Sequence, residues 1–291
     1  RDFLSRMGAK ASVDLGSGLT GLGLIEYGMR GDDGVNFSQN NKPGLRQIVV
    51  GVKGDFGKVT YGSQTLIWHK FVRSAYFSDG LDSLRQGAIR DDDMLQWEKK
   101  AGNWKFGAAL QTEKQDGDSF DQYQAGIEYK AGPVKLQAAL AADKRGENTG
   151  NLYGVRGWYN VSDSITLSAF YHFAEDDFDL YGGNSSGNVK LKSTLSGNDV
   201  GGVTSCKNEE RSTAGLYGKW KSDKNQVHLR YALNSCDVKG DVTSIKVEYI
   251  RYLSKKFRLW ASVEQLDSDT SRLPSTGEDM SEIQLGVRFD F

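Results

Sequence analysis

Residues 280–291 read MSEIQLGVRFDF, with apolar residues at every second position up to the last residue of the chain. Successive side chains of an extended strand point to opposite faces of the sheet. Ile283, Leu285 and Val287 therefore share one face, while Arg288 lies on the other. The segment predicts a β-strand with one apolar and one polar face rather than a solvated tail.

The same alternation recurs along the whole chain, in runs such as residues 7–15, 104–111 and 165–173. Each run has the length of about ten residues that a tilted strand needs to cross a bilayer. The connections alternate too, because short turns such as GDFG and KKAGN are interleaved with long segments such as residues 65–90 and 176–210. Alternating short and long connections are typical of an up-and-down barrel whose two ends differ.

The composition favours a sheet and argues against other classes. The chain has 35 Gly but only 3 Pro, with 13 Tyr, 13 Phe and 6 Trp, which suits strands better than long helices. No apolar stretch approaches the roughly 18 residues of a membrane-spanning helix. A net charge of -1, without a basic patch interleaved with aromatic residues, gives no support for a nucleic-acid partner. No signal peptide precedes the first alternating run, so we expect a processed or truncated chain.

The sequence therefore predicts an all-β fold, a transmembrane up-and-down antiparallel β-barrel formed as a single domain by residues 1–291. Counting the alternating runs gives about fifteen strands, whereas a single-chain bacterial barrel should have an even number. We expect sixteen, with the first strand missing before Arg1; a miscount within residues 176–210 is the alternative. A soluble β-sandwich also alternates polar and apolar residues, but it does not predict the sorting of the loops by length.

Two segments resemble the sixteen-stranded trimeric porins of Gram-negative outer membranes. Residues 5–28, SRMGAKASVDLGSGLTGLGLIEYG, resemble the second hairpin of that family, and residues 49–64, VVGVKGDFGKVTYGSQ, resemble its fourth and fifth strands. The resemblance covers essentially the whole chain. It implies an outer-membrane homotrimer in contact with lipid and lipopolysaccharide, without a cofactor, that passes small hydrophilic solutes. A terminal phenylalanine, here Phe291, is the assembly signal of the family.

In that family the third outer loop folds inward and narrows the pore. Here the loop is residues 65–90, and its many apolar residues need a wall to pack against. The resemblance implies that Asp79 and Asp82 form the acidic side of the constriction, while the same loop also supplies Arg73 and Arg85.

The sequence departs from the enterobacterial members of the family. Ser63 stands where they carry an arginine, and the loop motif Pro-Glu-Phe-Gly-Gly is absent. We therefore do not expect simple cation selectivity. Resemblance and inward parity place the following side chains on the pore wall: Arg6, Lys10, Glu26, Lys246 and Arg288.

Aromatic side chains raise a second possibility for the solute. Trp158 and Trp260 have inward parity and Trp68 lies in the loop, so their rings could stack on sugars, as in chitoporin-like, oligosaccharide-preferring porins. Packing under the loop is the alternative role for each ring. We expect a passive diffusion channel, with an oligosaccharide-preferring porin as the alternative, and an outer-membrane adhesin or phage receptor as the alternative of another class.

The remaining reactive residues do not indicate catalysis. The three histidines lack the outward-facing serine partner that an outer-membrane hydrolase would need near the lipid boundary, so we expect no enzyme. Acidic clusters such as residues 91–93 fit solvated loop edges better than a metal site. Cys206 and Cys236 fall in two long outer loops, where an oxidising exterior favours a disulfide over free thiols.

Overall fold

The structure, a computed structural model, describes residues 5–28, 38–39, 42–74, 76–77, 84, 86–112, 120–144, 149–176, 178, 190–192, 199–202, 209–238, 240–268 and 279–290. Fifteen strands form one sheet in chain order. They are β1 (Arg6–Gly16), β2 (Leu19–Gly28), β5 (Leu45–Gly54), β6 (Gly57–Thr65), β7 (Arg90–Ala101), β8 (Trp104–Gln111), β9 (Gln122–Ala131), β10 (Val134–Asp143), β11 (Gly150–Asn160), β12 (Ile165–Ala174), β15 (Arg211–Ser222), β16 (Asn225–Cys236), β17 (Val242–Tyr252), β18 (Phe257–Asp267) and β19 (Asp279–Phe289).

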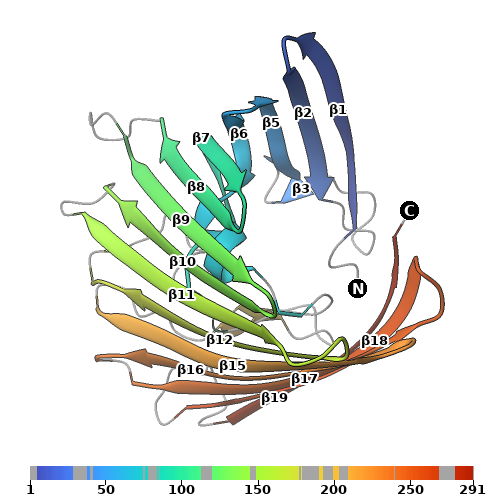
Figure 1. Ribbon diagram of the computed structural model, residues 1–291. Coiled ribbons are helices and arrows are strands. Elements are labelled where there is room, and N and C mark those ends of the chain that lie inside the picture. Colours follow the sequence, from blue (N-terminus) through green and yellow to red (C-terminus); the bar gives the residue numbers. More distant parts are fainter. Residues whose placement is uncertain are drawn as a thin grey trace.

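Every neighbouring pair in this sheet is antiparallel, so the predicted up-and-down order is confirmed. Short turns join the strands at one end, and longer segments join them at the other. Gly102 and Gly132 each begin a two-residue turn with a positive φ, which glycine adopts without strain. The sheet curves around an interior that contains the connection from β6 to β7 (Figure 1).

The remaining elements are small. They are β3 (Ser38–Gln39), β4 (Lys42–Pro43), the π-helix η1 (His69–Arg73), β13 (Lys190–Lys192) and β14 (Asp199–Gly202). β13 and β14 pair only with each other, so the described part of residues 176–210 adds no strand to the large sheet. The sixteenth strand, expected before Arg1, stays a prediction.

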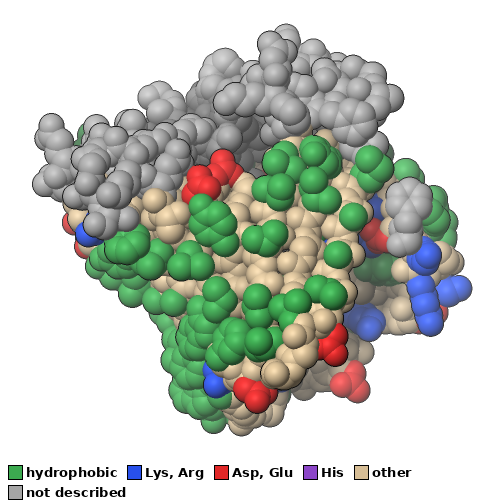
Figure 2. All heavy atoms as spheres, turned by 90° about the horizontal axis from the view of Figure 1, so that it is seen from above, with side chains coloured by type: hydrophobic (Ala, Val, Ile, Leu, Met, Phe, Trp, Pro, Cys, Tyr) green, Lys and Arg blue, Asp and Glu red, His purple; other side chains and the backbone are tan. Residues whose placement is uncertain are grey.

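The two faces of the sheet have the polarity of a membrane barrel. Outward positions such as Leu136 and Val287 are apolar and are 55% and 67% exposed, whereas the inward side chains of Gln137 and Arg230 are buried. This inverts the usual arrangement of a soluble protein and fits an outer face that contacts lipid. Figure 2 shows hydrophobic side chains scattered over one face of the molecule, with charged side chains mostly toward its edges. Among the described residues, no helix is long and apolar enough to span a bilayer.

Candidate pore constriction

The connection from β6 to β7 turns into the barrel instead of running over its rim. It begins after Thr65 and ends before Arg90, so the inward segment is one residue shorter at each end than predicted. Within its first turn, Trp68 and Phe71 have no exposed surface, and the π-helix η1 carries Phe71 and Val72 against the wall. These apolar residues form one buried cluster with residues from β7, β8, β10, β11 and β12.

Glycines in the wall leave the space that the loop occupies. A Cβ on Gly107 or Gly126 would lie 2.8 or 2.7 Å from the Phe71 ring, and one on Gly154 would lie 2.5 Å from the Trp68 ring. Real Cβ atoms do not approach other atoms so closely, so each position requires glycine while the loop is in place. Gly107 and Gly126 are directly opposite each other in β8 and β9, which makes a continuous recess.

Polar contacts fix the same part of the loop. The backbone N–H of Trp68 donates to Gln124 Oε1 (2.9 Å), and its indole N–H donates to the Gln86 carbonyl (2.9 Å). Lys70 Nζ donates to Gln96 Oε1 (2.8 Å) on β7. Hydrogen bonds add direction to apolar packing, so the loop is held in one orientation against the wall.

A second anchor lies farther along the loop, at Tyr76. Its ring stacks on Tyr217 of β15, with centroids 4.3 Å apart, and its hydroxyl lies 2.9 Å from Ser168 Oγ. The Arg156 guanidinium carbon lies 3.9 Å from the centre of the Tyr76 ring and 4.3 Å from that of Trp158. A cation between two aromatic faces attracts both rings.

Phe77 covers a buried group of charges on β16, β17 and β18, next to the strand that holds Tyr217. Lys246 Nζ and the Arg230 guanidinium carbon lie 5.0 and 5.6 Å from the centre of its ring. Both cations pair with Glu264, at 2.9 Å from Arg230 and 3.6 Å from Lys246. Lys246 therefore lies on the inner face as expected, but it is 1% exposed and is covered by the loop.

Three lysines share one carboxylate beneath the loop. Glu98 lies 2.6 Å from Lys70, 3.1 Å from Lys58 and 3.1 Å from Lys105. Burial lowers the pKa of Lys70, which lies outside the strands, and the adjacent charge of Glu98 acts in the opposite direction. A single carboxylate neutralises only one of these cations, so positive charge remains at this point of the wall.

A second basic group surrounds Glu26. Arg46 Nε donates to Glu26 Oε1 at 3.0 Å, and both side chains are about one-fifth exposed. Arg6 and Arg90 lie within electrostatic reach of this pair, and Arg288 also acts on Arg6. The expected wall residues Arg6, Glu26 and Arg288 are thus brought into one electrostatic group.

The structure describes some of the other predicted residues but not all of them. Arg73 ends η1, with Nη1 3.5 Å from His69 Nδ1, and Lys10 is exposed on the inner side of β1. Cys236 is disulfide-bonded and buried at the end of β16. The following predicted residues lie outside the described part of the chain: Asp79, Asp82, Arg85, Cys206 and Phe291.

The structure corrects one of the three aromatic predictions. Trp68 is completely buried against Gly154 and His172, so it offers no face to a passing sugar. Trp158 is half-buried, with Arg156 on its ring and Lys135 Nζ 5.0 Å from the ring centre. Trp260 is half-buried as well, packed over Gly286. Alternation assigned the inner face correctly but could not tell an open ring from a covered one.

Sequence reasoning missed several residues that shape the constriction. Arg156, Tyr217 and Glu98 all have inward parity, so their alternation with outward apolar residues was the available signal. Their partners are loop residues far away in the sequence. No local pattern could therefore have shown that Arg156 contacts Tyr76.

Comparison with known proteins is consistent with this architecture. A curated relative, outer membrane porin protein 32 of Delftia acidovorans, is 25% identical over 320 residues, covering 99% of this chain and 84% of the relative. Among solved structures, an anion-selective porin from Comamonas acidovorans is 20% identical with a TM-score of 0.71, covering 99% of this chain and 90% of that one. Salmonella typhi OmpF, solved with daunomycin, is 16% identical with a TM-score of 0.68, covering 97% and 89%.

The family model for Gram-negative porins matches residues 2–271, which is most of the 291-residue chain. Together with the inward loop and the apolar outer face, this match identifies an outer-membrane channel for the passive diffusion of small hydrophilic solutes. The chain belongs to the Gram-negative porin family.

Proposed function

We propose that this porin prefers anions to cations. The observation that carries the proposal is the excess of basic groups around two carboxylates of the inner wall, Glu98 and Glu26. Glu98 is shared by three lysines, and Glu26 is bonded to Arg46 with Arg6 and Arg90 close by. Fixed cations along a narrow, partly desolvated passage raise the local concentration of anions. The similar Comamonas acidovorans porin is described as anion-selective, which supports the proposal.

Asp79 and Asp82 remain the proposed acidic side of the constriction, and Arg73 and Arg85 the basic side of the same loop. The two aspartates would offset part of the positive charge on the wall. The reversal potential in a salt gradient tests whether the basic or the acidic groups dominate, because its sign reports whether the anion or the cation is more permeant. A value showing preferential chloride permeation supports the proposal, and a value showing preferential potassium permeation refutes it.

The oligosaccharide preference is weakened by the burial of Trp68. Cationic groups already contact Trp158, so its ring is not an open platform. An adhesin or phage-receptor role would rest on outer loops such as residues 179–189 and 269–278, which lie outside the described residues. Contact with lipopolysaccharide stays a prediction. Anion diffusion is the function that we carry forward.

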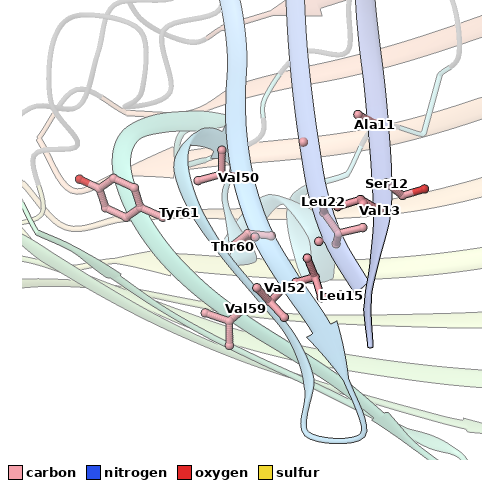
Figure 3. A pocket seen from close by; sticks show the side chains of 13 residues that line it. Ala11, Ser12, Val13, Leu15, Leu22, Val50, Val52, Val59, Thr60 and Tyr61 are labelled. Carbon is pink, nitrogen blue, oxygen red and sulfur yellow. The ribbon is translucent and has the colours of Figure 1, made fainter. Parts of the chain in front are cut away.

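We also propose a homotrimer, with a hollow on the first strands as the contact between subunits. The hollow has a volume of about 600 Å³ and is bounded by β1, β2, β5 and β6 (Figure 3). Val13, Val50 and Val59 line it, and Gly23 leaves it open, since a Cβ there would meet only Ala11 at 4.0 Å. Small and apolar residues allow two lipid-facing walls to approach closely.

A leucine at this glycine tests the contact. Gly23→Leu should fit the isolated subunit but fill the hollow, and so weaken trimers that resist detergent at room temperature. Gly157→Leu is the matched control, because Gly157 also faces outward and a Cβ there would meet only Leu136 at 3.7 Å. Equal trimer yields from both variants would place the contact elsewhere.

A further inference from the structure

Each of three consecutive hairpins has two lysines directly opposite each other. Each pair lies beside the short turn of its hairpin, on the inner face of the barrel. We call this set the lysine arc. Its pairs are Lys53 with Lys58, Lys100 with Lys105, and Lys130 with Lys135.

Such pairs are unfavourable for the sheet itself. Like charges directly opposite on neighbouring strands repel, whereas one acidic partner would make each pair attractive. The repetition in β5–β6, β7–β8 and β9–β10 therefore concentrates charge at a cost to folding. On the inner face of these strands, two carboxylates lie near the arc. Glu98 pairs with Lys58 and Lys105 of the arc and with Lys70 of the loop. Glu128 lies opposite Lys105 and accepts a hydrogen bond from Gln137 Nε2 at 2.7 Å. These two groups neutralise only part of the positive charge.

We infer that the lysine arc is a binding site for small multivalent anions of the oligophosphate type, at the periplasmic mouth of the channel. Short turns mark the periplasmic end of a bacterial barrel. Lysine binds phosphate as a flexible point charge, without the fixed geometry that arginine imposes. With about 4.8 Å between strands, the arc spans roughly 24 Å, so an extended anion contacts several lysines where chloride contacts one.

The arc lies at the turn end of β5 to β10, whereas Trp68 and Tyr76 of the loop contact β11 and β15. The arc meets the loop at Lys58 and Lys105, which share Glu98 with Lys70. Lys53, Lys100 and Lys130 are exposed, and Lys58, Lys105 and Lys135 are half-buried beside them. A solute that enters through the pore reaches the arc last, and a periplasmic solute reaches it first. The inference deepens the proposed anion preference and rests on it.

The test is calorimetric titration of the purified full chain with inorganic tripolyphosphate. The variant is Lys100→Gln with Lys130→Gln, which removes one exposed lysine from each of two pairs. Its matched control is Lys99→Gln, on the same strand as Lys100 but opposite Phe106 on the lipid-facing side. We expect the affinity for tripolyphosphate to fall about tenfold in the double variant and to stay unchanged in the control. Absence of binding to the unmodified protein, or an equal loss in the variant and the control, would overturn the site.

Two further measurements separate the possible failures. Relief of repulsion predicts that the double variant is at least as heat-stable as the unmodified protein, and a lower melting temperature would show that these lysines stabilise the fold instead.

In a bilayer, chloride preference without tripolyphosphate binding would overturn the site but leave the anion preference intact. Potassium preference would refute the anion preference, whatever the titration shows. Block of the current at lower tripolyphosphate concentration from the short-turn side than from the loop side would assign the site to periplasmic solutes, and equal block from both sides would contradict its position.

Discussion

Arg156, on the wall of the barrel, contacts Tyr76 of the inward loop, with its guanidinium carbon 3.9 Å from the centre of the tyrosine ring. The same guanidinium donates through Nη1 to the carbonyl and the hydroxyl of Ser74, at 2.7 and 2.8 Å. One side chain of β11 thus fixes two neighbouring points of the inward loop. The position of the inward loop therefore depends on a contact with the wall.

Arg156→Ala should loosen the loop around Tyr76. It removes a cation–π contact worth about 0.5–2 kcal/mol and the hydrogen bonds to Ser74. We expect a larger and noisier single-channel conductance in a planar bilayer. Arg156→Lys keeps the charge near the ring and should restore part of the steadiness. A conductance for Arg156→Ala equal to that of the unmodified channel would mean that other contacts hold the loop.

Gly126→Val should be incompatible with the present position of the loop. A Cβ there would lie 2.7 Å from Phe71 and 3.1 Å from Ile67. We expect a loss of about 1–3 kcal/mol of stability through overpacking, or a displaced loop with altered conductance. Gly218→Val is the control on the outer face, where the nearest atom is on Leu167 at 3.7 Å. Similar unfolding free energies and conductances for both variants would argue against the recess.

Val247→Arg should test which face meets lipid. Val247 lies in the middle of β17, is 41% exposed and points away from the interior. Arginine near the bilayer midplane should cost about 2–4 kcal/mol, and at Leu259, close to the turn, it should cost about 0–1 kcal/mol. Unfolding in urea from lipid vesicles measures the difference. Equal costs at the two depths would contradict the assigned orientation.

Mass spectrometry without reductant should find the peptides of Cys206 and Cys236 linked. The bond would join the segment before β15 to Cys236 at the end of β16 and contribute about 2–4 kcal/mol, mainly by restricting the unfolded chain. Reduction should lower the unfolding temperature while leaving the conductance close to its original value. Two freely alkylated cysteines in protein from intact outer membranes would rule out the pairing.

The fold could be predicted from the sequence because each membrane-spanning strand alternates apolar residues that face lipid with polar residues that face the interior. The runs around Leu136 and Val287 each carry their own alternation, and the alternating run of residues 104–111 coincides with β8. The contacts of the inward loop were harder to predict from the sequence, because they join residues that lie far apart in the chain. The composition of the loop predicted that it needs a wall, but the recess at Gly126 becomes visible only when Phe71 lies in it. Parity likewise placed Lys246 inside without showing that Phe77 covers it.

The reversal potential in a potassium chloride gradient tests the central claim most directly, because it reports the net effect of all charges along the pore. For the unmodified channel we expect preferential chloride permeation. Arg6→Gln with Arg90→Gln should move the potential toward cation preference while leaving the Arg46–Glu26 pair intact, and Asp79→Asn with Asp82→Asn should move it toward stronger anion preference. Arg251→Gln, on the outward side of β17 opposite Leu259, is the control and should leave it unchanged. Preferential potassium permeation in the unmodified channel, or a potential insensitive to both arginines, would contradict the account.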